Sequence, residues 1–174
     1  MKLCGLLVLT CALAVGCGDD EGPTSPSSPN TIVFTANLLP SNERPSPVTN
    51  AEASGRGTAN ITFNLTRTAA GAVQSGTVDF HYDLTGFPPG TIITASHIHT
   101  GTSDVSGPIL VNTTQSAATA LGLTSGSGSS EFRGVTADAA TLQSIIDTPA
   151  NFYFNVHSTT NPGGVARGQL VRQP

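Results

Sequence analysis

The sequence predicts an all-β fold, an antiparallel Greek-key sandwich or barrel with one short helix. Apolar and polar residues alternate along several short segments, and turns that contain Gly or Pro separate these segments. Only one segment has apolar residues at helical spacing. Short strands joined by such turns, with almost no helix, are typical of β-sandwiches and barrels.

Two segments show the alternation most clearly. In residues 57–66 every second residue is apolar from Ala59 to Leu65, and in residues 78–84 the apolar set runs from Val78 to Leu84. Since strand residues two apart point to the same face, each segment has one face for a core and one polar face. Further strands are predicted at residues 31–39, 92–99, 108–111, 151–158 and 165–171, with a weak strand at 119–123.

The remaining segments have the composition of loops, apart from one helix. Residues 41–54 hold two prolines and several small polar residues, and residues 112–130 are rich in Ser, Thr, Gly and Ala. Thr136 is the predicted N-cap of the helix, because Ala139, Leu142 and Ile145 follow it at helical spacing. The helix is expected to end before Pro149.

The first residues predict an exported chain. Residues 1–16 have the positive start and short apolar run of a secretory signal peptide, and this run is too short to span a bilayer. Ala14-Val15-Gly16 before Cys17 is similar to a bacterial lipobox, in which the cysteine is acylated, although an ordinary signal peptide is the alternative. We therefore expect a lipid anchor at Cys17 in the cell envelope, and Gly18 favours the outer membrane.

Composition divides the chain and excludes some functions. Residues 17–30 are acidic and then rich in Pro and Ser, which predicts a flexible tether before one domain at residues 31–174. All three cysteines lie at or before Cys17, so the domain has no disulfide to offer. The formal charge of −4 becomes −5 once Lys2 leaves with the leader, which argues against a nucleic-acid partner.

Three histidines are the candidate metal ligands. His97 and His99 lie two apart on one strand, His157 lies on another, and all three are predicted to point away from the core. Neutral imidazoles from two strands can bind copper or zinc. The alternatives are solvated surface histidines and histidines that only hold neighbouring strands together.

Two further residues are expected near this set. In a direct hairpin that pairs position 81 with position 97, His81 and Asp79 would approach the three histidines. Arg167 is also predicted to point away from the core, where it could be an exposed charge on an edge strand.

The chain resembles the CHRD (chordin) domain family over residues 32–173. The motifs that carry the resemblance are FTANLLPSNERPSP, GTVDFHYDLTGFPPG, ASHIHTG with GPIL after it, FYFNVHS and GGVARGQL. The resemblance implies an extracellular protein with a β-sandwich of immunoglobulin-like character. The family has no well-defined biochemical activity.

A second resemblance, to Cu/Zn superoxide dismutase, concerns the order of the histidines and of the closing Gly-Gly-x-x-Arg. It implies a dismutase-like sandwich in which His97, His99 and His157 match copper ligands and Arg167 matches an anion-guiding arginine. The chain has no counterpart of the metal-bridging histidine, of the zinc-ligand loop or of the intrachain disulfide.

These observations support two hypotheses about function. The first is a non-catalytic, lipid-anchored module that binds an unknown protein or glycan partner. The second is a mononuclear copper or zinc protein whose ligands are His97, His99 and His157.

Overall fold

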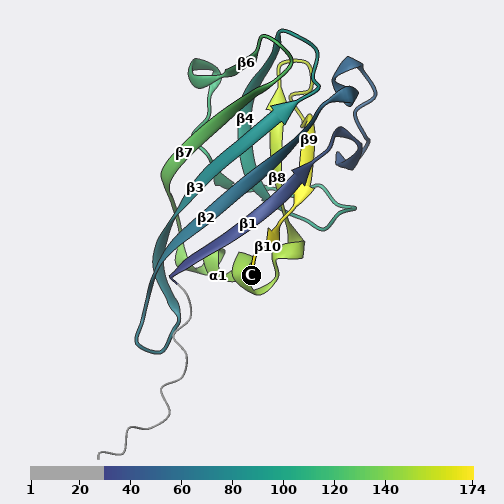
Figure 1. The fold of residues 1–174 in the computed structure, drawn as a ribbon. Coiled ribbons are helices and arrows are strands. Elements are labelled where there is room, and N and C mark those ends of the chain that lie inside the picture. Colours follow the sequence, from purple (N-terminus) through teal and green to yellow (C-terminus); the bar gives the residue numbers. More distant parts are fainter. Residues whose placement is uncertain (1–29) are drawn as a thin grey trace, which may run out of the picture.

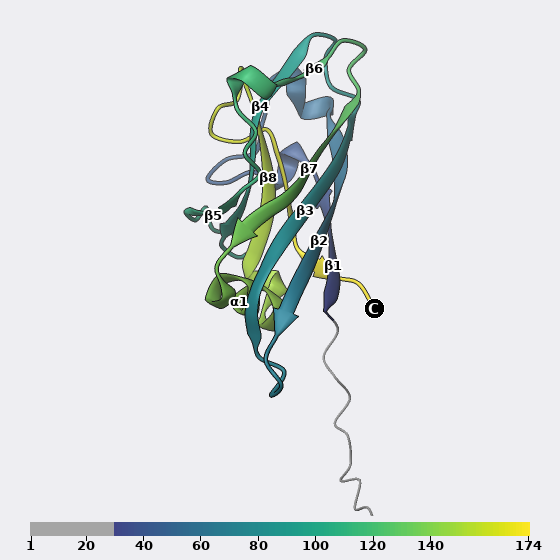
Figure 2. The same cartoon turned by 90° about the vertical axis from the view of Figure 1, so that its left-hand side faces the viewer.

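The chain folds into two antiparallel β-sheets packed face to face (Figures 1 and 2). The computed structural model describes residues 30–174, so the predicted leader, Cys17 and all of the predicted tether except Asn30 lie outside the described residues. The first sheet has the order β10-β1-β2-β3-β7, and the second has the order β5-β4-β8-β9, with β6 paired to β4. The predicted all-β sandwich with one short helix is confirmed.

The elements have the following bounds. The first sheet consists of β1 (Thr31–Leu38), β2 (Arg56–Arg67), β3 (Val73–Thr85), β7 (Gly128–Ala137) and β10 (Val171–Arg172). The second consists of β4 (Thr91–Thr100), β5 (Ile109–Asn112), β6 (Leu121–Leu123), β8 (Phe152–Ser158) and β9 (Ala166–Gln169). The α-helix is α1 (Ala139–Asp147), and short 3₁₀ turns span Pro40–Asn42, Ala51–Ser54, Ala117–Thr119 and Pro149–Asn151. No helix within residues 30–174 has the length and apolar character needed to cross a membrane.

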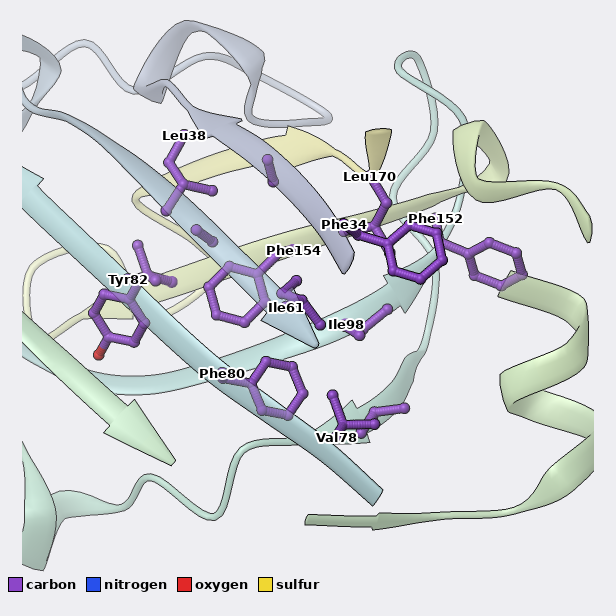
Figure 3. Packing of buried hydrophobic residues seen from close by; sticks show 14 of the residues in the cluster. Phe34, Leu38, Ile61, Val78, Phe80, Tyr82, Ile98, Phe152, Phe154 and Leu170 are labelled. Carbon is purple, nitrogen blue, oxygen red and sulfur yellow. The ribbon is translucent and has the colours of Figure 1, made fainter. Parts of the chain in front are cut away.

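The core lies between the sheets and is built from the predicted apolar faces. From the first sheet, Phe80 and Tyr82 of β3 point inward and meet Phe154 of β8 (Figure 3). The ring centroids of Phe80 and Phe154 are 5.8 Å apart, and those of Tyr82 and Phe154 are 5.9 Å apart. Aromatic pairs at such distances add to the stabilisation from buried area.

The connection between β3 and β4 differs from the prediction. These strands are consecutive in the chain, but they belong to different sheets, because the corner at residues 86–90 passes from one sheet to the other. His81 is paired with Asn60 of β2 and Glu131 of β7. The expected register between positions 81 and 97 is therefore wrong.

Two local predictions are also wrong. Residues 128–130 were expected in a loop, yet they begin β7, whose Ser- and Gly-rich start has no apolar alternation to reveal it. The N-cap of α1 is Asp138, not Thr136, because the Asp138 carboxylate accepts a hydrogen bond from the Thr141 amide at 2.9 Å. Thr136 belongs to β7 and pairs with Thr77.

The outer face of the second sheet, which points away from the core, is covered by three loops. The loop of residues 39–55 contacts β8, because the Asn155 amide donates to both Glu43 carboxylate oxygens at 3.2 Å. The loop of residues 101–108 is held to β9 by Arg167, and the turn of residues 159–164 lies beside His157. The loops thus bury a polar sheet face that the sequence pattern alone would predict to be exposed to solvent.

Candidate metal centre

His97, His99 and His157 come together on the covered outer face of the second sheet. His97 and His99 are two apart on β4, and β8 lies beside β4 with Ala95 opposite His157 and His97 opposite Asn155. One nitrogen from each histidine forms a group in which all atoms lie within 4.8 Å of one another. The structure thus brings together the three histidines that the sequence singled out.

The hydrogen bonds fix which ring nitrogens carry protons. Nδ1 of His99 lies 2.9 Å from the Gly107 carbonyl, and Nδ1 of His157 lies 2.9 Å from the Pro162 carbonyl. A carbonyl only accepts, so both Nδ1 atoms donate and both Nε2 atoms keep a lone pair. His97 Nδ1 lies 3.2 Å from His157 Nε2 and donates to it.

An unpartnered nitrogen at the centre fits a bound ion. Among the described residues, only His99 Nε2 and Asn155 Oδ1 are buried side-chain atoms without a hydrogen-bond partner. Both belong to this layer, and a buried polar atom without a partner costs about 1–3 kcal/mol. A metal ion bound to His99 Nε2 would remove that cost for the nitrogen.

The distances also fit a single ion after a small adjustment. Three nitrogens bound at about 2 Å to one ion in a plane lie roughly 3.5 Å apart. The 3.2 Å between His97 Nδ1 and His157 Nε2 is already close to this separation. The 4.8 Å limit of the whole group requires a shift of about 1 Å, and the proton of His97 must move to its other nitrogen.

Burial keeps the three rings neutral. The exposed fractions are 7% for His97, 8% for His99 and 8% for His157, so the alternative of solvated surface histidines is wrong. Burial, followed by the neighbouring His157 and His99, lowers the pKa of His97 to about 4. Burial also lowers the pKa values of His99 and His157. The rings therefore have the neutral form that binds metals at neutral pH.

Tyr153 and Arg167 support the centre from the side. The Tyr153 ring is stacked on the His99 ring, with centroids 4.9 Å apart and planes within 5°. The Arg167 guanidinium carbon lies 3.6 Å from the Tyr153 centroid. Because β8 lies between β4 and β9, Tyr153 separates His99 from Arg167. This stack fixes the orientation of the His99 ring.

Arg167 is buried, so the interpretation of Arg167 as an exposed charge on an edge strand is wrong. Its exposed fraction is 1%, and its guanidinium donates to the Thr102 carbonyl at 2.9 Å and the Val105 carbonyl at 3.1 Å. It also donates to Gln169 at 3.3 Å. With its donors bound to the loop of residues 101–108, Arg167 holds this loop in place and does not face solvent to attract an anion.

His81 and Asp79 lie away from the centre, on the other sheet. His81 contacts Asp83 at 3.0 Å in a partly exposed position, whereas Asp79 accepts hydrogen bonds from the Asn64 side chain and the Gly134 amide. These contacts belong to the outer face of the first sheet. The two residues therefore have no contact with the three histidines.

Glu43 is a buried acid that the sequence did not single out. It is 4% exposed, and burial raises its pKa to about 7 against the opposing effects of Arg167 and Asn155. The sequence places Glu43 in a loop rich in proline, and no local pattern shows that this loop folds over β8. Only its position in the FTANLLPSNERPSP motif sets it apart.

Comparison with known proteins agrees with the resemblance seen in the sequence. The family model of the CHRD domain matches residues 34–170, a range that contains all three histidines, Glu43 and Arg167. A search of curated proteins and a search of solved structures returned no match.

Replacing Arg167 with Gln should reduce the free energy of unfolding by about 3 kcal/mol, because the carbonyls of Thr102 and Val105 lose their donors and Tyr153 loses its cation. Urea unfolding measures this change. Arg133→Gln is the matched control, since Arg133 is exposed and should cost less than about 0.5 kcal/mol. Equal, small effects of both substitutions would contradict the anchoring role of Arg167.

Glu43 should make stability depend on pH in a direction that is unusual for an acid. Its pKa rises from 4.5 to about 7 on folding, so the folded state keeps a proton that the unfolded state loses. Relative to Glu43→Gln, the metal-free wild type should therefore lose up to about 3 kcal/mol of stability as pH rises from 4.5 through 7. Urea unfolding of both proteins at several pH values measures this difference, and a difference that does not change with pH would refute the buried-acid assignment.

Proposed function

The chain belongs to the CHRD domain family, and we propose that this member binds one copper or zinc ion through His97, His99 and His157. One observation carries the proposal: three neutral imidazoles converge in a buried layer where His99 Nε2 has no other partner. Among residues 30–174, no other group of His, Cys, Asp or Glu side chains gathers in this way.

Each of the three histidines presents a defined ring nitrogen to such an ion. His99 and His157 present Nε2, because their Nδ1 atoms are held by carbonyls, and His97 presents Nδ1. Hydrogen bonds of this kind orient metal-binding histidines and fix their tautomers. A bound copper ion would supply one-electron chemistry. We propose metal binding alone, without a catalytic step.

The proposed location follows from the first residues of the sequence. The signal-peptide pattern of residues 1–16 and the residues before Cys17 support an exported protein held by a lipid at Cys17, in the cell envelope and by preference at the outer membrane. Binding of a protein or glycan partner, the other expected function, rests on the sequence alone.

Calorimetric titration of the whole chain in detergent with Cu(II) or Zn(II) tests the proposal. One ion should bind per chain, and His97→Ala and His157→Ala should each weaken binding by at least about 100-fold, because two imidazoles bind far less tightly than three. His81→Ala is the matched control, since His81 lies on the other sheet, and it should bind like the wild type. Weak binding that neither His97→Ala nor His157→Ala changes would disprove the proposal.

A further inference from the structure

We propose that the three-histidine centre holds the monovalent ion Cu(I) in preference to Cu(II) and Zn(II). The inference rests on the proposed metal-binding function and names the ion that this site selects. Four features of the centre support it: the charge of its ligands, their burial, the neighbouring charged groups and the number of ligands.

The ligands bring no negative charge. The group consists of His97, His99 and His157, and no carboxylate or thiolate of the described residues belongs to it. A neutral imidazole leaves the charge of the ion unchanged, so bound Cu(I) keeps one positive charge whereas bound Cu(II) or Zn(II) keeps two. The uncompensated charge at this centre is therefore twice as large for a divalent ion.

Burial makes that difference matter. The three rings are between 7% and 8% exposed, so little water remains beside them to stabilise a positive charge. In a continuum description the cost of removing an ion from water grows with the square of its charge. Buried charges are tolerated when an opposite charge is close. The centre thus penalises divalent ions more strongly than a monovalent one.

The groups around the ligands do not supply the missing negative charge. The Nδ1 atoms of His99 and His157 donate hydrogen bonds to the carbonyls of Gly107 and Pro162. Neither Nδ1 atom donates to a carboxylate, which would make the ring a more basic metal ligand. The covering loop of residues 39–55 has two buried carboxyls, Glu43 and Glu52, and neither belongs to the ligand group. Glu43 accepts from Asn155, and Glu52 accepts from Ser158 and Asn161. The positive charge of Arg167 opposes whatever negative charge Glu43 carries.

The number of ligands favours the same ion. Structural zinc sites almost always have four ligands, and catalytic ones complete three protein ligands with water. Cu(I) forms stable complexes with three ligands or fewer, so it needs no fourth group in this covered layer. Cu(II) is the strongest competitor, because it binds nitrogen ligands more tightly than the other divalent ions of its row.

Competition titrations on the whole chain in detergent test the inference. Cu(I) is titrated without oxygen against the chromophoric chelator bicinchoninate, and Cu(II) and Zn(II) are titrated against chelators of known affinity. The dissociation constant for Cu(I) should be at least about 100-fold lower than those for Cu(II) and Zn(II). The reduction potential of the bound copper should then lie at least about 120 mV above that of the free ions, since tenfold corresponds to about 59 mV for one electron.

The outcomes separate this inference from the proposed function. If Cu(II) or Zn(II) binds as tightly as Cu(I), and His99→Ala abolishes that binding, the preference is wrong although the metal site stands. If no ion binds more tightly to the wild type than to His99→Ala, the proposed function fails and the inference fails with it. His81→Ala should reproduce every wild-type affinity and the wild-type potential.

Discussion

The structure depends on the burial of a polar sheet face. The strands β4, β8 and β9 place polar side chains on the face opposite the core, and the loops of residues 39–55, 101–108 and 159–164 cover that face. Once water is excluded, every polar atom in the layer needs a partner. Arg167, Tyr153 and Glu43 find theirs within the layer, and the unsatisfied atoms, His99 Nε2 and Asn155 Oδ1, mark where a partner is missing.

The same loops give the histidines their geometry. The Gly107 carbonyl orients His99 and the Pro162 carbonyl orients His157, so the cover acts on the ligands directly. Gly107 has no room for a side chain, because a Cβ there would collide with the Thr100 carbonyl. The glycine of the GPIL segment thereby lets the loop of residues 101–108 return close to β4. The loops that cover the sheet face therefore also orient His99 and His157.

The sequence predicted the parts that depend on local pattern. Alternation placed Phe80 in the core, and the two-residue spacing placed His97 and His99 on one face. The pairing of β3 with β7 joins segments that β4, β5 and β6 separate in the chain, so local pattern did not reveal it and the expected place of His81 was wrong. Burial of Arg167 was not predictable for the same reason, because the loops that cover it are rich in Pro, Gly and Ser and show no periodicity.

A crystal structure of the copper-loaded protein, with anomalous diffraction measured on both sides of the copper absorption edge, tests the central claim most directly. One anomalous peak is expected about 2 Å from Nδ1 of His97 and from Nε2 of His99 and His157. The hydrogen bonds of the two other Nδ1 atoms to Gly107 and Pro162 should be retained. A peak elsewhere, or none beside these nitrogens, would contradict the account.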